Sequence, residues 1–432
     1  MKDYVKIIAD KINAGIPIIF YALGSGMFLH IKELKVRFNL LPTAVCDGDI
    51  KKQGIAFKGL EGLFVMSPSE AVKIENSEIY VTTLDYRYEI FAYLTDKLKV
   101  SPERIINYVP VKKVRSCNFL QKCVIYDRDD AIRFCWRKQG PRIYSSEEKL
   151  DIENVVKTKN ELLKKIEVSN EQGTDCENCL QICEKHYAVE PSPWCINFFC
   201  KSKCNFKCSY CTLINSNKKS KYSTVNDTGN SEGLRPLTEI LSEFRKADSI
   251  NEAHSIVLST AGEPFLHPKL SKFVDEFDGY EFCINTNGSI FNEHIFEMMN
   301  RKRIFFTVSI DSGTKETFER VKGVNAFEKV KSNLMRYSNA KIGFIALKYT
   351  FVPGVNDNEE DIDGFVDFVQ ETGGIFVILS LDYYSVNKIT EYTKSQAKRL
   401  KSKLSKINIM ITPYTMWETS EYIEAIKELF NN

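Results

Sequence analysis

Short apolar runs alternate with amphipathic stretches through the first hundred residues. Four of these runs have the character of buried strands, at residues 16–23, 43–46, 62–65 and 78–82. The stretches between and after them have the apolar spacing that is typical of helices. Parallel strands are joined by helices that cover the faces of their sheet, so this alternation predicts an α/β domain with a Rossmann-like parallel sheet over residues 1–111.

The same alternation returns near residue 193 and continues towards the end of the chain. Six further strands are predicted, at residues 195–201, 255–259, 281–285, 304–310, 342–351 and 376–381. Helical stretches such as residues 359–370 follow them. Six strand-helix units predict a partial (β/α)6 barrel, an arc of parallel strands, over residues 193–432.

Residues 112–192 follow a different pattern. Two strand-like runs, at residues 123–126 and 131–136, precede a charged helical stretch at residues 147–167. We expect this part to be a cysteine-bearing connector between the two α/β parts, because the regular alternation on either side is missing here.

Length and composition narrow the class of protein. A chain of 432 residues is longer than one hydrophobic core normally serves, and 43% hydrophobic with 27% charged residues is ordinary for a soluble globular protein. Lys and Arg number 59 against 57 Asp and Glu, so no net field attracts a nucleic acid. The start resembles no signal peptide and no apolar run is long enough to span a bilayer, so we expect a cytoplasmic protein.

The sequence contains 13 cysteines. Since the cytosol keeps thiols reduced, metal or cluster ligation is a better explanation of clustered cysteines than disulfides. The scattered ones are expected to be small buried apolar residues, namely Cys46, Cys117, Cys123 and Cys283.

Cys204, Cys208 and Cys211 are the strongest chemical signal, with three and then two residues between them. Three thiolates on one loop can bind three irons of a cubic iron-sulfur cluster and leave the fourth iron open. Structural zinc is the alternative, although it requires a fourth ligand and the next cysteine downstream is Cys283.

This Cys-x3-Cys-x2-Cys motif, with an aromatic residue before its last cysteine, resembles the radical S-adenosylmethionine (SAM) superfamily. The resemblance covers residues 193 to about 390. Further matches lie in the family's order at the ends of predicted strands: Ala261-Gly262-Glu263-Pro264, Thr286-Asn287-Gly288 and Ser309-Ile310-Asp311. Ligands of parallel β/α folds bind outside the carboxyl ends of the strands, where these matches fall.

The resemblance implies that the three cysteines hold a 4Fe–4S cluster whose open iron binds SAM. An electron from a donor such as flavodoxin or ferredoxin then cleaves SAM to methionine and a 5′-deoxyadenosyl radical, which takes hydrogen from a small-molecule or peptide substrate. An oxidoreductase of this kind implies further site residues: Gly262 and Glu263 for the methionine ammonium, Asn287 and Ser309 for the ribose or carboxylate, and Tyr210 near the adenine.

Simpler structural roles are open for several of these positions. Gly262 and Gly288 are also suited to turns that need positive φ. Asp311 is equally suited to cap a helix that starts near Thr314. Arg320 lies where related enzymes often keep an arginine for the SAM carboxylate, but a solvated helix face explains it as well. His267 is expected at a helix start.

A second cysteine group lies in the connector. Cys135, Cys176, Cys179 and Cys183 resemble the ligands of a SPASM-like auxiliary domain and imply a second iron-sulfur cluster. Here the group precedes the predicted barrel, whereas the usual arrangement places it afterwards. Structural zinc and buried thiols remain alternatives.

Gly24 and Gly26 follow the first predicted strand, and Asp47 ends the second. This layout is typical of a nucleotide site, although Leu29 occupies the place of its third glycine. Residues 18–107 resemble Rossmann-like domains of bacterial polysaccharide-biosynthesis proteins, which implies a nucleotide-linked sugar substrate in surface-glycan assembly. Two alternatives are a radical SAM enzyme that modifies peptides or proteins and a non-catalytic redox- or nucleotide-sensing protein.

Overall fold

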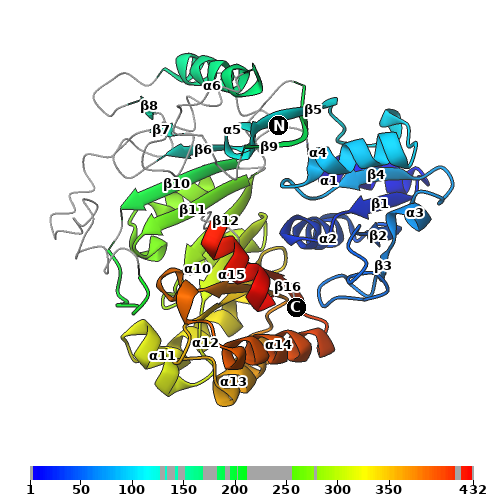
Figure 1. Cartoon of the computed structure of the whole chain (residues 1–432). Coiled ribbons are helices and arrows are strands. Elements are labelled where there is room, and N and C mark those ends of the chain that lie inside the picture. The colour runs from blue at the N-terminus through cyan, green and yellow to red at the C-terminus, as the bar shows by residue number, and fades with distance from the viewer. Residues whose placement is uncertain are drawn as a thin grey trace. The chain divides into compact units, whose positions relative to one another are not determined.

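A computed structural model describes most of the chain (Figure 1). The described residues are 3–126, 132–133, 142–144, 151–168, 182–189, 195–201, 203–211, 255–276, 280–413 and 420–430. The chain divides into two compact units, the first comprising Met1–Phe199, Leu234–Val257 and Asp275–Phe282, and the second Cys200–Gly233, Leu258–Val274 and Cys283–Asn432. The three-part division into residues 1–111, 112–192 and 193–432 stays a prediction.

The first unit begins with the parallel sheet that the alternation predicts. Its strands are hydrogen-bonded in the order β3-β2-β1-β4, and all three pairings are parallel. This is the strand order of half a doubly wound fold. The elements are α1 (Tyr4–Asn13), β1 (Ile18–Tyr21), α2 (Ser25–Phe38), β2 (Ala44–Cys46), β3 (Val65–Met66), α3 (Pro68–Ala71), β4 (Glu78–Val81), α4 (Arg87–Ala92), η1 (Tyr93–Lys97) and η2 (Pro102–Arg104).

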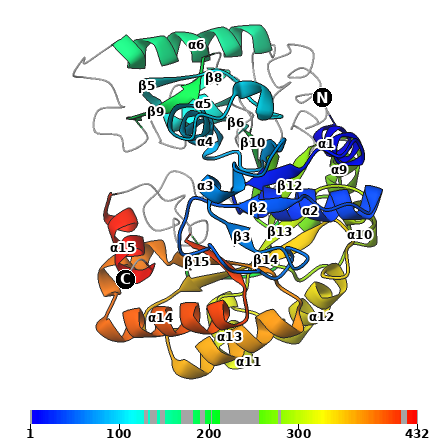
Figure 2. The ribbon, with the colours of Figure 1, turned by 90° about the vertical axis from the view of Figure 1, so that its right-hand side faces the viewer.

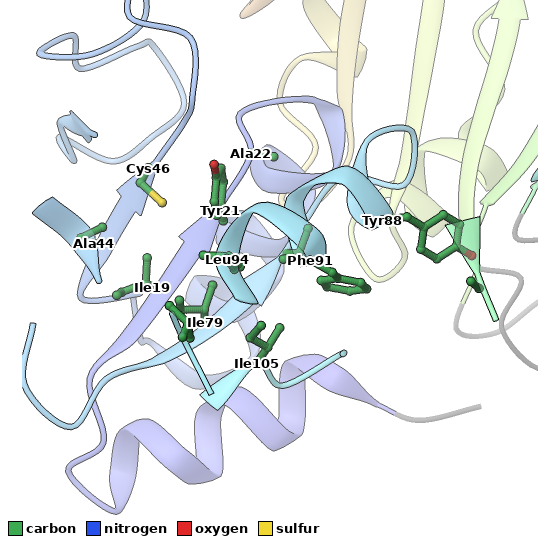
Figure 3. Packing of buried hydrophobic residues seen from close by; sticks show 14 of the residues in the cluster. Ile19, Tyr21, Ala22, Ala44, Cys46, Ile79, Tyr88, Phe91, Leu94 and Ile105 are labelled. Atoms are coloured by element: carbon green, nitrogen blue, oxygen red, sulfur yellow. The ribbon is translucent and has the colours of Figure 1, made fainter. Parts of the chain in front are cut away.

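Helices pack on both faces of this sheet because its strands are apolar on both. Ile19 and Tyr21 of β1 belong to a buried cluster with Phe91 of α4 (Figure 3). On the other face Tyr80 of β4 contacts His30 of α2, and its hydroxyl lies 3.0 Å from Nε2 of that histidine. All four residues of β1 are buried, as expected of a strand covered on both sides.

The connector contains a strand pair that the sequence pattern did not predict. β5 (Val111–Cys117) pairs antiparallel with β9 (Ile182–Ala188), and α5 (Asn118–Lys122) follows β5 directly. The predicted charged helix is α6 (Ile152–Val168), which lies along β5 (Figure 2).

Lys159 of α6 is buried, and its amine has no hydrogen-bond partner among the residues that the structure describes. Burial lowers the pKa of Lys159 from its ordinary value of 10.5 to about 7. The folded chain therefore binds fewer protons than the unfolded chain between these pH values, and the free energy of unfolding rises with pH across them.

Lys159→Met is expected to stabilise the protein by on the order of 2 kcal/mol at pH 7, because it replaces a buried unpaired amine by an apolar group of similar length. Urea denaturation at pH 6, 8 and 10 measures the effect. The gain should be largest at pH 6 and smallest at pH 10. The matched control is Lys157→Met on the exposed face of α6. A loss of stability in Lys159→Met at every pH would contradict this prediction.

Four further strands lie wholly or mainly in the first unit. β6 (Cys123–Tyr126) pairs parallel with β10 (Cys195–Lys201), so that Cys123 lies opposite Cys195. β6 also pairs antiparallel with β7 (Ile132–Arg133), which pairs with β8 (Arg142–Tyr144). The strands predicted at 123–126 and 195–201 are thereby confirmed, whereas most of the strand predicted at 131–136 lies outside the described residues.

The second unit contains the parallel β/α sheet that the alternation predicts. Strands β12 to β16 are neighbours in sequence order, and the pairings β13–β14, β14–β15 and β15–β16 are parallel. β16 was not predicted. The strands and helices are β11 (Ser255–Ala261), η5 (Pro264–Leu266), α9 (Leu270–Asp275), β12 (Glu281–Thr286), α10 (Glu293–Met299), β13 (Ile304–Ser309), α11 (Lys315–Lys322), α12 (Phe327–Tyr337), β14 (Phe344–Phe351), α13 (Glu359–Glu371), β15 (Phe376–Leu381), η6 (Tyr383–Lys388), α14 (Glu391–Lys406), β16 (Met410–Pro413) and α15 (Ser420–Phe430).

The turn after β13 touches α13 backbone to backbone. A Cβ atom at Gly313 would lie 2.0 Å from the carbonyl oxygen of Asp361, and one at Gly364 would lie 2.4 Å from the carbonyl oxygen of Gly313. The Asp361 carboxylate accepts hydrogen bonds from the amides of Gly313 and Thr314, at 3.0 and 3.1 Å. Two glycines and one carboxylate therefore set the distance between this turn and the helix.

Two sequence-based expectations concern the chain as a whole. The scattered cysteines Cys46, Cys117, Cys123 and Cys283 are all buried, which confirms their expected character. None of the helices in the described part of the chain combines the length and the apolar character needed to cross a membrane.

Candidate functional site

The cysteine loop, residues 203–211, is fixed by its backbone to the end of α11. The amides of Lys207 and Ser209 donate to the carbonyl oxygens of Lys322 and Val321, at 3.0 and 2.9 Å. These carbonyls have no partner within the helix itself. Gly323, at φ 67°, ends α11, and a Cβ atom there would lie 2.7 Å from the carbonyl oxygen of Lys207. The close approach of loop and helix therefore depends on this glycine.

The three cysteines of the loop are accessible. Cys204 is exposed, while Cys208 and Cys211 are partly buried. Burial raises the pKa of Cys208 to about 11, and the nearby charge of Lys322 acts in the opposite direction. Iron binds the thiolate, so a bound cation would supply the charge that favours ionisation here.

The donor set fits an iron-sulfur cluster better than zinc. Among the described residues, no three His, Cys, Asp or Glu side chains converge closely enough to hold one metal ion. A zinc ion needs its sulfur ligands within about 2.3 Å of a single point. A 4Fe–4S cluster binds each sulfur at a different iron, so its ligands lie further apart. Three thiols on one loop match the number of protein ligands that such a cluster with one open iron needs, whereas structural zinc needs a fourth ligand.

Glu263 joins the loop after β11 to the end of β12 and to the cysteine loop. Its buried carboxylate accepts hydrogen bonds from the hydroxyl of Thr286 at 2.6 Å and from the amide of Asn287 at 2.7 Å. Its own amide donates to the carbonyl oxygen of Lys203 at 2.9 Å. Burial raises the pKa of Glu263, and these hydrogen bonds oppose that rise by stabilising the ionised form.

Asn287 contacts the cysteine loop directly. Its side-chain amide donates to Oδ1 of Asn205 at 2.9 Å, and Asn205 in turn donates to the hydroxyl of Ser289 at 2.8 Å. The structure therefore brings three sequence-predicted segments together, those of Cys204–Cys211, Glu263 and Asn287, through side-chain and backbone hydrogen bonds.

The hydroxyl of Tyr210 contacts two buried charged side chains, Asp311 and Lys322. Its hydroxyl donates to Oδ2 of Asp311 and accepts from Nζ of Lys322, the second contact at 2.7 Å. The Lys322 amine also forms an ion pair with Asp311 and lies 5.1 Å from the centroid of the Tyr210 ring. The sequence reasoning assigned Tyr210 to the adenine and did not predict this contact with two charges.

Asp311 does not cap α11, which corrects one of the two expectations for it. Thr314 is the N-cap residue, and its hydroxyl accepts from the amide of Thr317 at 3.2 Å. Asp311 instead has a left-handed backbone, with φ 58°, and its Oδ1 accepts from the amide of Thr350 at 2.5 Å. A carboxylate turned back towards the sheet cannot reach the start of the following helix.

Ser309 is the last residue of β13 and lies opposite Lys348 of β14. The neighbouring Tyr349 packs against Phe365 of α13, with ring centroids 4.7 Å apart. Side chains alternate along a strand, so Lys348 and Ser309 lie on the sheet face away from α13. Burial lowers the pKa of Lys348 to about 8, with the charge of Asp311 acting against this shift.

The structure also shows the surroundings of the other residues for which a structural role was left open. Arg320 donates to the hydroxyl of Thr317 at 2.9 Å and to the carbonyl oxygen of Val355 at 3.2 Å. Gly262 and Gly288 both have positive φ, as turn glycines do. His267 lies just before α9 and its Nδ1 accepts from the amide of Lys269 at 3.3 Å, which confirms the helix-start role.

Most of the predicted auxiliary cysteine group lies outside the described residues, which do not include Cys135, Cys176 and Cys179. Cys183 is in β9, partly buried, with its sulfur 3.7 Å from the hydroxyl of Tyr187. The second cluster stays a prediction.

The glycine loop of the N-terminal sheet has structural roles. A Cβ atom at Gly26 would lie 2.4 Å from the carbonyl oxygen of Thr82. The carboxylate of Asp47 accepts from the amides of Leu23 and Asp49, at 2.7 and 2.8 Å. Close packing of α2 on β4 and a hydrogen-bonded turn therefore account for Gly26 and Asp47 without a ligand.

Sequence reasoning missed Asn205 and Lys322. Asn205 lies inside the cysteine motif, whose resemblance to the family depends on the cysteines themselves. Lys322 resembles a solvated lysine at a helix end, and its burial becomes visible only with the fold. The available sequence signal was Gly323, because a glycine at this position is typical of the C-terminal end of a helix.

Three comparisons with known proteins each found similar proteins. The family model "Radical SAM superfamily" matches residues 201–369. A "GTP 3′,8-cyclase" of Aliarcobacter butzleri is 27% identical over 185 residues, which are 42% of this chain and 52% of that protein. A "UPF0026 protein" of Helicobacter pylori is 22% identical over 197 residues, 42% of this chain and 58% of that protein. The chain thus spans little more than half the length of these relatives.

Solved structures with a similar arrangement include Streptococcus suis SuiB bound to S-adenosylmethionine. It is 13% identical, covers 64% of this chain and 56% of its own, and has a TM-score of 0.40. A radical SAM methyltransferase from Sphaerobacter thermophilus is also 13% identical, covers 62% and 84%, and has a TM-score of 0.37.

Proposed function

Because residues 201–369 form a domain of the radical SAM superfamily, we propose that this chain is an enzyme that cleaves SAM reductively and abstracts hydrogen from a substrate. The observation that carries the proposal is the junction of the cysteine loop with the segments of Glu263 and Asn287. Segments far apart in sequence are joined at the one loop that bears three closely spaced thiols.

Cys204, Cys208 and Cys211 would hold a 4Fe–4S cluster. The cluster and SAM, when bound, supply the electron and the sulfonium from which methionine and a 5′-deoxyadenosyl radical arise. The protein's own part is to hold the thiols on a loop whose backbone is fixed to α11, so that the ligands need little reorganisation. A partner that delivers single electrons, such as a flavodoxin or ferredoxin, belongs to this proposal.

The residues around the loop would bind SAM in the roles that the family implies. Gly262 and Glu263 would accept the methionine ammonium, through a carbonyl oxygen and a carboxylate suited to a cation. Asn287 and Ser309 would contact the ribose or carboxylate, and Tyr210 would lie by the adenine. The internal hydrogen bonds of Glu263 support a prearranged carboxylate at this position.

The substrate is proposed to carry an anionic group, such as a phosphate or carboxylate. Lys348 supports this, because a partly buried lysine lies on the same sheet face as Ser309. The relatives named GTP 3′,8-cyclase take a nucleotide. A nucleotide-linked sugar has the same chemistry, while the comparisons add nothing in favour of a glycan in particular.

Incubation of the anaerobically reconstituted protein with SAM and dithionite tests the proposed activity. Liquid chromatography should detect 5′-deoxyadenosine, and iron and sulfide analysis should give about four of each per cluster. A colourless protein that binds zinc at the loop would overturn the proposal. A protein that holds the cluster and releases no 5′-deoxyadenosine would favour the non-catalytic sensor instead. Addition of a nucleoside triphosphate, a nucleotide sugar or a peptide then shows which substrate class raises turnover.

A further inference from the structure

Two opposite charges are buried directly beneath the cysteine loop. The side chains of Lys322 and Asp311 are 1% and 0% exposed, and they form an ion pair. Both contact the hydroxyl of Tyr210, which lies between Cys208 and Cys211 in the sequence. A charge in such a position acts through little water, so its effect on neighbouring groups is strong.

Stability alone does not explain this pair well. Removing two charges from water usually costs about as much as their attraction returns, and buried pairs are often replaceable by apolar residues. The pair is nevertheless held firmly from both sides. Lys322 is the last residue of α11 and its carbonyl oxygen accepts from the amide of Lys207, while Asp311 is bound to the amide of Thr350.

The two charges contact the cysteine loop differently. Lys322 contacts it twice, through its carbonyl oxygen at Lys207 and through its amine, which lies 5.1 Å from the centroid of the Tyr210 ring. The carboxylate divides its two oxygens between the backbone of β14 and the Tyr210–Lys322 side. The cation therefore contacts the loop through its main chain and its side chain, whereas the anion contacts it through one carboxylate oxygen and partly neutralises the cation.

We infer that Lys322 is a positioning residue that raises the reduction potential of the cluster at the cysteine loop, and that Asp311 limits this rise. The inference rests on the proposed function. Reduction adds one electron to the cluster, and a fixed cation nearby stabilises the more negative reduced state. The same amine, bonded to Tyr210, fixes the loop that carries the ligands.

The test is an anaerobic redox titration of the reconstituted full chain, followed by EPR. Lys322→Gln should lower the midpoint potential and Asp311→Asn should raise it. We expect each to change the ratio of reduced to oxidised cluster at least tenfold at fixed potential, which corresponds to 59 mV for one electron. The double variant should return towards the wild-type value, and Lys322→Arg should keep it.

Opposite shifts separate this role from a structural one, because loss of structure would move both single variants in the same direction. Shifts of one sign, or none, overturn the inference. If Lys322→Gln does not fold, Asp311→Asn alone decides, since its potential must rise. Lys331→Gln removes a cation that pairs with Glu371, and serves as the control that should leave the potential unchanged. A wild-type protein without a cluster would refute the proposed function instead.

Discussion

Simultaneous replacement of Cys204, Cys208 and Cys211 by alanine is expected to reduce 5′-deoxyadenosine formation to the level of a protein-free control. The three sulfurs are the ligands that the proposed cluster requires, and no described side chain nearby forms a substitute set. Chromatographic detection of 5′-deoxyadenosine after incubation with SAM and dithionite measures the loss. If the connector cysteines bind the predicted second cluster, the variant should keep about one cluster's worth of iron.

The matched control is Cys46→Ala in the N-terminal sheet. Cys46 is a buried free cysteine that belongs to the apolar cluster of that sheet, so its loss should leave iron content and turnover unchanged. Equal loss of activity in Cys46→Ala would show that the cysteine substitutions act through general damage. Retained activity in the triple variant would remove the cysteine loop from the reaction.

Gly313→Ala is expected to destabilise the protein by about 3 kcal/mol. Its new Cβ atom would lie 2.0 Å from the carbonyl oxygen of Asp361 and 2.4 Å from the amide nitrogen of Phe365. Backbone atoms of a helix cannot move aside individually, so α13 must shift as a unit and weaken the hydrogen bonds of Asp361. Equilibrium denaturation in urea, monitored by circular dichroism, measures the change.

Gly24→Ala provides the comparison for this prediction. Gly24 has extended backbone with φ −164°, and a Cβ atom there would meet nothing within 4 Å. Its replacement should change stability by less than about 1 kcal/mol. A similar loss in both variants would mean that the close approach of Gly313 and α13 is not the cause.

Much of the fold was predictable because local pattern and burial coincide. The strand predicted at 376–381 is β15 (Phe376–Leu381), and the strand predicted at 304–310 is β13 (Ile304–Ser309). Both are buried parallel strands, which appear in sequence as continuous apolar runs. The helix predicted at 359–370 differs from α13 by one residue at its end.

The missed elements have physical reasons. β5 (Val111–Cys117) is mostly exposed or half-exposed and contains Lys112, Lys113 and Arg115, so its sequence resembles a charged loop. Its partner β9 begins at Ile182, and a pairing over such a distance leaves no local signal. β16 has four residues and ends at Pro413, which is too short for a period to be recognised.

The candidate site shows the same division between local and non-local information. The proximity of the cysteine loop, Glu263 and Asn287 was predictable because their motifs occur in a fixed order at strand ends. The contacts of Lys322 were not, since they join positions 210, 311 and 322 through the fold. Charge pairs that depend on three distant segments carry no signature in any one of them.

The cysteine loop is attached to α11 through main-chain amides, and this has a practical consequence. The side chain of Lys207 is exposed, while its amide makes the attachment. The attachment of the loop to α11 therefore does not depend on which side chain stands at position 207. Position 207 is a suitable place for a spectroscopic label or an immobilisation tether close to the proposed cluster site, because the chemistry of the appended group would not alter the bond that holds the loop.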